Sequence, residues 1–313
     1  MSLEVKNLTK KYGEKTVVDN LSFEISKPGV YALLGTNGAG KTTSIRMILG
    51  MLAYDTGEII WKGKPLDAVN CNVGYLAEER GLYPKYALID QMVYFARLRN
   101  VSKADALKRI KYWSDRFDVG EYIYPGKTSK GKTLPPKKPE QLSKGNQQKI
   151  QLISALLSDP ELLILDEPLS GLDPVNTDLF KSVIYEQIEK EKYLIMSSHQ
   201  MPTVEEFCTD ITILDRSKTV LQGNLNEIKK SYGRVNLFVK CESDIDSLVE
   251  ECGIQLLNKK ETEYKLKVSS EDQANSLLSK IIEHKMQVIR FELREPSLHE
   301  IFVEKVGGES EEK

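Results

Sequence analysis

Eight residues near the N-terminal end have the pattern of a loop that wraps a phosphate group. They read Gly-Thr-Asn-Gly-Ala-Gly-Lys-Thr and match G-x-x-x-x-G-K-[ST]. Glycines let the backbone curl so that its N–H groups point at phosphate oxygens, and a following helix start adds partial positive charge. In this pattern the lysine reaches the β- and γ-phosphates of a nucleotide and the final threonine ligates Mg²⁺. The residues expected to bind here are Gly35, Thr36, Asn37, Gly38, Ala39, Gly40, Lys41, Thr42 and Thr43.

Two acids, Asp166 and Glu167, follow the apolar run at residues 162–165. That run fits a buried strand, and ligands of an open α/β sheet bind at the carboxyl ends of its strands. Asp166 is placed to hold Mg²⁺, directly or through water, and Glu167 to polarise an attacking water. Two acids after a strand are by themselves more often a helix N-cap region. Together with the phosphate loop they predict a site for nucleotide hydrolysis.

The apolar pattern predicts the elements that position these groups. Polar and apolar residues alternate in two strand-like segments, 3–5 and 21–25, and short apolar runs at 30–34, 162–165 and 193–196 fit buried strands. One helical pattern follows the phosphate loop, and another spans about 88–107. Buried strands that alternate with helices predict an α/β fold with a largely parallel sheet.

Beyond residues 222–223 the order of elements changes. The pattern there predicts strand, helix, strand, strand, helix and strand, at 235–239, 245–251, 254–257, 264–268, 271–282 and 287–293. That order is the ferredoxin-like split unit. A short helix through His299 and Phe302 follows, and the acidic tail 307–313 is predicted to be disordered. We therefore predict a domain over 1–222, with a helical subdomain at about 82–160, and an accessory domain over 223–306.

The composition excludes several classes of protein. The 313 residues carry a formal charge of −2, which gives no support for a general nucleic-acid binder. The first residues lack the pattern of a signal peptide, and no apolar run approaches the ~18–20 residues that cross a bilayer. The cysteines show no metal-like spacing and predict buried thiols in a reducing cytosol, without disulfide bonds. They are Cys71, Cys208, Cys241 and Cys252.

One loop stands apart in charge. Residues 126–140 contain five lysines, three prolines and a single acid, which predicts an exposed, poorly ordered segment. Contact with lipid headgroups or a partner, and a solvated surface insert, are both open for it; base rates for loops favour the insert.

Further motifs, taken in order along the chain, resemble those of ABC-type ATPases. Tyr12-Gly13 resembles the aromatic segment that stacks on adenine, and Leu142-Ser143-Lys144-Gly145-Asn146-Gln147-Gln148 resembles the signature segment. Ser170-Gly171-Leu172-Asp173 resembles the D-loop, and Ser197-Ser198-His199 the switch histidine. The resemblance covers residues 1 to about 222. It implies a P-loop NTPase fold with a RecA-like core and antiparallel β and helical subdomains.

The resemblance also implies roles for individual residues. In this family two ATPase domains face each other, so that Ser143, Lys144 and Gly145 of one chain would bind the γ-phosphate held by Lys41 of the other. His199 would orient the reacting groups, with Glu167 as the base. Asp173 and Tyr12 would also line the nucleotide site. A plain helix N-cap is the alternative for Ser143, since serine and glycine are good caps.

Three positions depart from the family pattern. Lys144 and Asn146 replace the commoner glycine and glutamine of the signature, and the added positive charge of Lys144 favours phosphate binding. Glu78 stands where the family usually has a glutamine that offers an oxygen to Mg²⁺. A glutamate offers an oxygen too, so we expect Glu78, Thr42 and Asp166 around the metal.

The C-terminal unit resembles the one found after exporter ATPases of the drug- and sodium-efflux type, with its closing motif at 295–302. The implied protein is an ATP- and Mg²⁺-dependent ATPase subunit of an ABC exporter on the cytoplasmic side of the membrane. Its implied partners are a separate transmembrane permease and a second ATPase subunit, identical or different, without nucleic acid. One alternative is a soluble ABC ATPase of ribosomes or DNA, although such relatives usually carry two motor domains or a long coiled coil. The other is a nucleotide-dependent regulator that does not hydrolyse ATP.

Overall fold

The computed structural model describes residues 2–67, 71–78, 81–127 and 133–307 of the chain. The chain divides into two compact units, Met1–Gln222 and Gly223–Lys313, and each is described by itself. Within the described ranges, no helix combines the length and the apolar character that crossing a bilayer requires.

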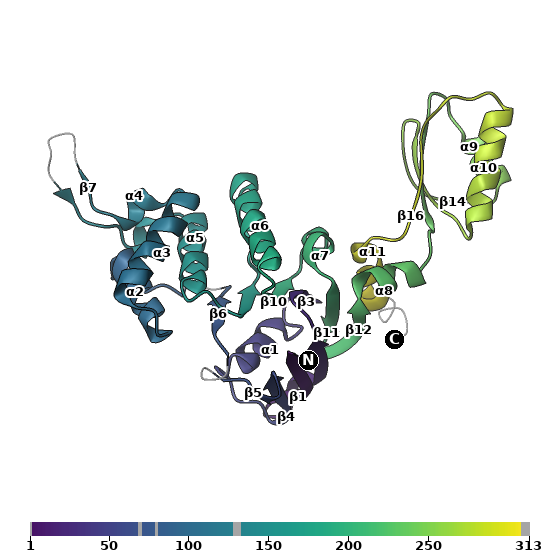
Figure 1. The fold of residues 1–313 in the computed structure, drawn as a ribbon. Coiled ribbons are helices and arrows are strands. Elements are labelled where there is room, and N and C mark those ends of the chain that lie inside the picture. The colour runs from purple at the N-terminus through teal and green to yellow at the C-terminus, as the bar shows by residue number, and fades with distance from the viewer. Residues whose placement is uncertain (1, 68–70, 79–80, 128–132, 308–313) are drawn as a thin grey trace. The chain divides into compact units, whose positions relative to one another are not determined.

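A six-stranded sheet forms the centre of the first unit (Figure 1). Its strands lie in the order β12 (Lys218–Asn224), β11 (Asp210–Asp215), β3 (Gly29–Gly35), β10 (Tyr193–Ser198), β9 (Leu162–Asp166) and β6 (Val73–Leu76). The five strands from β11 to β6 run parallel to their neighbours. The apolar runs predicted to be buried strands, at 30–34, 162–165 and 193–196, form β3, β9 and β10. Every residue of β9 is buried. Their carboxyl ends therefore meet at one edge of the sheet.

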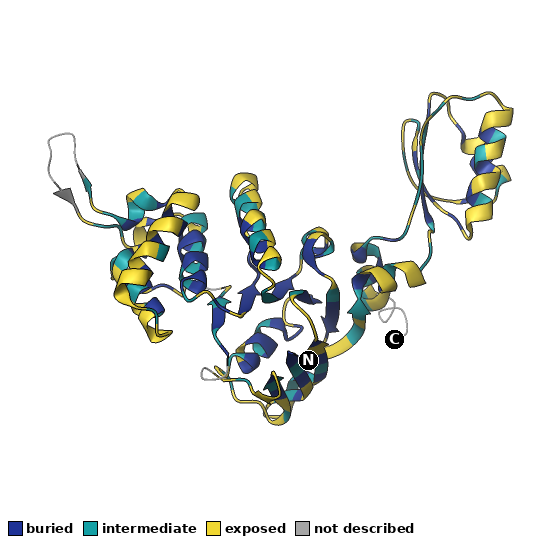
Figure 2. Ribbon diagram, viewed as in Figure 1, coloured by how far each residue is buried: buried dark blue, intermediate teal, exposed yellow. Residues whose placement is uncertain are grey.

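A smaller antiparallel sheet packs against this one. It holds β2 (Lys15–Ile25), β1 (Leu3–Tyr12), β4 (Thr56–Trp61) and β5 (Lys64–Pro65), in that order. Its buried side chains share one core with β3, β9 and helix α1 (Lys41–Ile48), drawn dark blue in Figure 2. The rings of Phe23 and Tyr31 stack across the two sheets with centroids 4.6 Å apart. This core fixes the β1–β2 hairpin beside the start of α1.

Four helices form the helical part of the first unit: α2 (Leu88–Leu98), α3 (Lys103–Arg116), α4 (Gly120–Ile123) and α5 (Lys144–Leu156) (Figure 1). The prediction of one helix over about 88–107 is wrong, because the chain turns between α2 and α3. Asn100 adopts a positive φ of 59°, and the Ser102 hydroxyl caps α3 by accepting from the Asp105 N–H. Asparagine tolerates that conformation and serine is a strong N-cap, so both residues end one helix and begin another.

The basic segment 126–140 is more ordered at its ends than predicted. Strands β7 (Gly126–Lys127) and β8 (Thr133–Leu134) pair antiparallel, and a 3₁₀ turn, η1 (Pro139–Gln141), follows. The Lys137 N–H donates to the Tyr122 carbonyl, and the Lys137 ammonium lies 4.4 Å from the Tyr122 ring centre. These contacts tie the segment to α4, which composition alone did not indicate. Residues 128–132 lie outside the described residues.

Two more helices follow strands of the central sheet. Helix α6 (Pro174–Glu189) comes after β9, and α7 (Met201–Phe207) comes after β10. The side chain of Asp173 caps α6 by accepting from the Asn176 N–H. Both helices therefore begin near the carboxyl edge of the sheet.

The second unit has the predicted strand and helix order, so the predicted fold class is confirmed for both units. After α8 (Leu225–Ser231) come β13 (Asn236–Cys241), α9 (Asp246–Glu251), β14 (Gln255–Lys260), β15 (Glu263–Lys267), α10 (Glu271–Glu283), β16 (Val288–Arg294) and α11 (Leu298–Gly307). The antiparallel sheet has the order β14-β15-β13-β16. One face packs on α9 and α10 through Leu237, Val239, Leu248 and Leu277. Helix α8 was not predicted, and tail residues 308–313 lie outside the described residues.

Candidate functional site

The phosphate loop joins the end of β3 to the start of α1, and its shape depends on glycine. Gly35, Gly38 and Gly40 have φ values of 152°, 82° and 107°, a region that side chains disfavour. A Cβ at Gly35 would lie 2.3 Å from the Leu214 carbonyl oxygen, and one at Gly40 would lie 2.6 Å from the Val17 carbonyl oxygen. The loop backbone therefore passes so close to β11 and β2 that only glycine fits at these two positions.

The remaining predicted residues of the loop region differ in exposure. Thr36, Asn37 and Gly38 form the exposed tip, Ala39 and Gly40 are buried, and Thr42 and Thr43 are half-buried. Tyr12 ends β1 with 55% of its surface exposed, on the hairpin whose Val17 reaches Gly40. An exposed aromatic ring on this hairpin is suited to stacking on a flat base.

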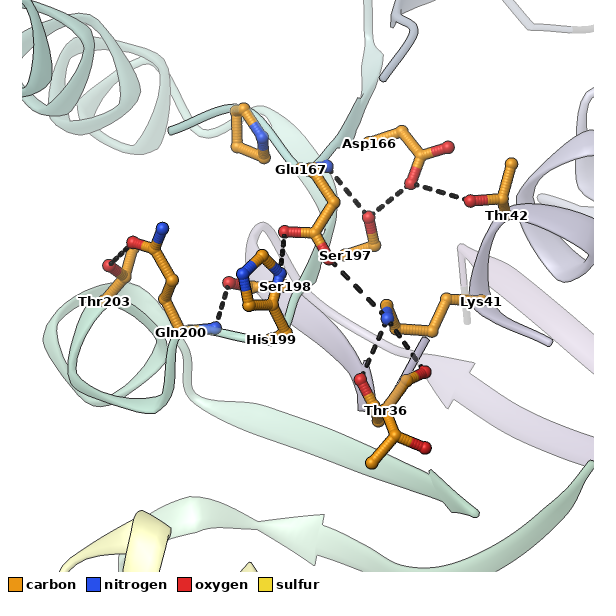
Figure 3. Close-up of polar contacts among 12 residues, drawn as sticks. Thr36, Lys41, Thr42, Asp166, Glu167, Ser197, Ser198, His199, Gln200 and Thr203 are labelled. Atoms are coloured by element: carbon orange, nitrogen blue, oxygen red, sulfur yellow. Dashed lines mark hydrogen bonds and ion pairs between the residues drawn. The ribbon is translucent and has the colours of Figure 1, made fainter. Parts of the chain in front are cut away.

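The ammonium of Lys41 lies inside the loop. Its Nζ donates to the carbonyl oxygens of Gly35 at 2.8 Å and Thr36 at 3.3 Å, and it lies 3.6 Å from Oε1 of Glu167 (Figure 3). The side chains of Lys41 and Glu167 are each only 6% exposed. A buried cation at the start of α1 and a buried carboxylate just beyond β9 therefore face each other.

The carboxylate of Asp166 is held by two hydroxyl groups. Its Oδ1 accepts from Thr42 Oγ1 at 3.4 Å and from the Ser197 hydroxyl, which is itself buried (Figure 3). Burial raises the pKa of Asp166, and these two hydrogen bonds oppose that effect. Within the described part of the chain its Oδ2 is buried and has no hydrogen-bond partner. An acceptor left open in this way invites a cation or its water.

Glu167 is the link between Lys41 and His199. Its Oε2 lies 2.9 Å from Nδ1 of His199, and its backbone N–H donates to the Ser197 hydroxyl at 2.9 Å. The His199 side chain is 48% exposed, whereas that of Glu167 is 6% exposed. The imidazole therefore lies at the mouth of the site and the carboxylate at its floor. Glu167 has a φ of 50°, an uncommon value for a residue with a side chain.

The residues present fit Mg²⁺ together with a triphosphate. Across the described ranges no three His, Cys, Asp or Glu side chains converge to hold a metal by themselves. Mg²⁺ commonly takes one or two protein oxygens and fills its shell with phosphate oxygens and water. The open Oδ2 of Asp166 and the hydroxyl of Thr42 are such oxygens. Glu78 is exposed two residues beyond β6, which neighbours β9 at the same edge, and its place around the metal stays a prediction.

The predicted signature and D-loop residues form a second group. Ser143 caps α5 by accepting from the Asn146 N–H at 3.3 Å, as its simpler alternative role requires. A Cβ at Gly171 would lie 3.4 Å from the ammonium of Lys144. A Cβ at Gly145 would lie 3.6 Å from the side chain of Asn176, in the first turn of α6, the helix that Asp173 caps. The starts of α5 and α6 therefore lie side by side.

Two residues of the site stand within the motifs of the family resemblance, but the sequence predicted no contact or role for either. Ser197 joins Asp166 to the backbone of Glu167, and Gln148 donates from Nε2 to the Pro168 carbonyl oxygen at 2.7 Å. The signal for Ser197 is a hydroxyl at a position that alternates with Ile195 in a buried strand, where an apolar residue is expected. Gln148 gave no such signal, because an amide in the first turns of a helix is ordinary.

Comparisons with known proteins agree on both units. The family described as "ABC transporter" matches residues 18–170, and the family described as "ATP-binding protein DrrA1-3-like, C-terminal domain" matches residues 223–306. An uncharacterised ABC transporter ATP-binding protein of Bacillus subtilis, YhaQ, is 44% identical over 98% of this chain and 99% of its own length. The linearmycin resistance ATP-binding protein LnrL of the same organism is 29% identical over 97% of this chain and 98% of its own. A solved structure described as the ATP binding subunit of an ABC transporter superposes with a TM-score of 0.66 at 28% identity, covering 74% of this chain and 94% of its own.

Proposed function

Because this chain belongs to the family of ABC transporter ATP-binding proteins, we propose that it binds and hydrolyses ATP to drive a transport pore formed by a separate polypeptide. The observation that carries the proposal is the chain of contacts from Lys41 through Glu167 to His199, at the edge where the phosphate loop and the acidic strand end. A phosphate-binding cation, a base and its orienting imidazole are the groups that phosphoanhydride hydrolysis needs.

Each side chain has a distinct task. Lys41 exchanges its contact with Glu167 for phosphate oxygens, which leaves the Glu167 carboxylate free to accept a proton from water. His199, at the mouth of the site, holds Glu167 through Nδ1 and keeps the buried carboxylate oriented. Thr42 and Asp166 would hold Mg²⁺, which when bound neutralises charge on the phosphates. The loop glycines supply N–H donors to the same oxygens.

Two ATPase chains are required for a complete site in this proposal. Helix α5 begins with Lys144, and the partial positive charge at its N-terminal end offers a second place for phosphate. The contacts of Ser143 and Lys144 lie with α5 and the loop before α6, whereas those of Lys41 lie with β3 and Glu167. ATP would therefore lie between the Lys41 of one copy and the Ser143 and Gly145 of the facing ATPase, whether identical or different.

A groove in the helical part is the proposed docking place for the pore subunit. A cavity of about 370 Å³ is lined by side chains that include Met51, Tyr75, Leu82, Phe95 and Leu98. Near it, three tyrosines are half or more exposed, namely Tyr83, Tyr86 and Tyr94, at 51%, 65% and 50%. An apolar groove rimmed by exposed aromatic rings suits an amphipathic helix from the cytoplasmic side of the permease. The groove lies along β6, the strand beside β9, so its occupant would be close to the catalytic edge.

Export is the proposed direction of transport. The second unit matches the C-terminal domain family of DrrA1-3-like ATP-binding proteins. The relative LnrL is named for resistance to linearmycin. Resistance by transport requires the cargo to move outward, and we extend that direction to this chain. The protein would then work at the cytoplasmic surface of the membrane, bound through its permease.

Two measurements on the full chain test the proposed function. Purified protein should hydrolyse ATP only when Mg²⁺ is present, and a tagged copy should copurify from native membranes with a polypeptide that spans the bilayer. ATP binding without Mg²⁺-dependent hydrolysis would favour the regulator. A tagged protein that stays wholly soluble and brings down ribosomes or DNA would favour the soluble ATPase.

A further inference from the structure

Ser197 occupies a core position in strand β10 and yet carries a hydroxyl group. In the parallel register Ile195 lies opposite Ile164, and Ser197 lies opposite Asp166. Ile195 and Ile164 belong to the hydrophobic core between the two sheets, and Ser197 is 0% exposed. Side chains two residues apart on a strand share one face, so Ser197 continues the core face to the place where the polar site begins.

Both hydrogen-bonding functions of this hydroxyl are used by site residues (Figure 3). Its proton goes to Oδ1 of Asp166, and its oxygen accepts the backbone N–H of Glu167 at 2.9 Å. The neighbouring hydroxyl, of Ser198, accepts instead from the Gln200 N–H at 2.9 Å, in the turn after β10. Ser197, and not Ser198, therefore connects the two acids.

This connection constrains both acids. Asp166 receives its two hydroxyl hydrogen bonds on Oδ1, which leaves Oδ2 as the open acceptor. Glu167 is held at a φ of 50°, a conformation that persists in ordinary residues only where the surroundings fix it. The Ser197 hydroxyl is one of the groups that fix it.

We propose that Ser197 is a positioning residue that sets the Asp166 carboxylate for Mg²⁺ and the Glu167 backbone for water activation. The inference rests on the proposed ATPase function. Partners of metal ligands typically change metal affinity or activity about 10- to 100-fold when removed. A serine that only fills space and satisfies its own hydroxyl would change the stability of the fold without a selective effect on the metal.

The test compares wild-type full-length protein with Ser197→Ala, and uses Thr212→Val as the matched control. Thr212 is also 0% exposed in the same sheet, and its hydroxyl pairs with Tyr31 at 2.7 Å, away from the acids. Metal affinity is measured by titrating Mn²⁺ into protein that holds a non-hydrolysable ATP analogue, followed by electron paramagnetic resonance. Affinity for a fluorescent ATP analogue is measured separately with the metal chelated, and the Mg²⁺ dependence of ATP hydrolysis is the third readout.

Ser197→Ala should weaken Mn²⁺ binding about 10-fold or more and raise the Mg²⁺ concentration for half-maximal hydrolysis in parallel. Metal-free nucleotide affinity should stay within about twofold, because Ser197 does not line the phosphate loop. Thr212→Val should leave all three unchanged. If Ser197→Ala matches Thr212→Val, or loses metal-free binding to the same extent as metal binding, Ser197 is structural only.

A second pair of variants tests the same proposal if Ser197→Ala folds poorly. Ser197→Thr and Ser197→Val have side chains of the same shape and differ in the hydroxyl, so metal affinity should be kept in the first and lost in the second. Equal metal affinity in the two would overturn the assignment. The Mn²⁺ readout needs no turnover, so a wild-type protein that binds Mn²⁺ and nucleotide without hydrolysis would contradict the ATPase proposal while still testing the role of Ser197.

Discussion

Replacing Glu167 by glutamine separates the charge of this side chain from its shape. Its Oε1 lies 3.6 Å from the Lys41 ammonium, and both side chains are 6% exposed, so solvent screens the pair little. At an effective dielectric constant of about 20, unit charges at that separation attract by about 5 kcal/mol before the cost of desolvation is subtracted. A triphosphate must compete with this attraction for Lys41. Glu167→Gln removes the competitor and also the repulsion between a carboxylate and the γ-phosphate.

In Glu167→Gln the rate of ATP hydrolysis should fall, whereas the affinity for ATP should not. A positioned general base contributes about 10²- to 10⁴-fold to a rate, which is about 3–5 kcal/mol of barrier. We expect a loss of that size in the rate of a single turnover, with an unchanged or stronger affinity for ATP and retained ATP-driven pairing of two chains. Glutamine keeps an oxygen near His199 Nδ1, so the fold of the site should survive.

The assay combines single-turnover hydrolysis with equilibrium binding of ATP in the presence of Mg²⁺. Glu161→Gln is the matched control, because Glu161 precedes the other end of β9 and is 51% exposed beside Lys62. It should leave both readouts unchanged. An unaltered rate in Glu167→Gln would remove this residue from the role of base. A joint loss of binding and hydrolysis would show that the carboxylate holds the site together instead.

Three further outcomes follow from contacts of single side chains. Lys41→Ala should weaken ATP binding about 10- to 100-fold in equilibrium titrations, since a charged hydrogen bond to phosphate is lost; unchanged affinity would contradict the role of Lys41. His199→Ala should slow single-turnover hydrolysis about 10²-fold, the low end for a group that assists proton transfer, and leave ATP affinity nearly intact; equal losses would indicate a folding role. Burial alone would raise the pKa of Glu300, but hydrogen bonds from Lys265 and Ser297 lower it to about 2. Because its pKa is lowered in the folded protein, the ionised Glu300 carboxylate stabilises the fold at pH values above its ordinary pKa of 4.5. This stabilisation is lost as the pH falls toward about 2. Glu300→Gln should therefore speed amide exchange in β13 and α11 at pH 7, and the difference from wild type should shrink below about pH 3; a difference that does not depend on pH would show that charge is not the cause.

Much of the fold could be predicted because buried parallel strands leave a strong apolar signal. The runs that became β3, β9 and β10 are nearly continuous in apolar residues, and each ends where a motif begins. The same holds for the second unit, in which the strand and helix pattern matched the observed order. Motif residues at strand ends are predictable together, since a parallel sheet brings those ends to one edge.

Local interruptions were harder to predict than strands. The apolar face of α2 continues in register toward α3, so periodicity alone suggested one helix. The break depends on Asn100 and Ser102, whose conformational preferences outweigh the pattern over a single turn. The hairpin of β7 and β8 was hidden for a related reason, because its lysines and prolines dominate the composition while a few backbone contacts order its ends.

The order of strands in the sheet explains why the contacts of Ser197 with the two acids were not predicted. Along the chain β9 comes before β10, but in the sheet β10 lies between β3 and β9. Ser197 therefore has Leu33 opposite it on one side and Asp166 on the other. The phosphate loop follows β3 and the two acids lie at the end of β9; these strands are not neighbours in the sheet, and β10 lies between them. A hydroxyl near the end of this strand can contact both acids at the end of β9. The sequence motifs identify the reacting groups. The positioning residue, Ser197, can be identified only when the order of the strands in the sheet is known.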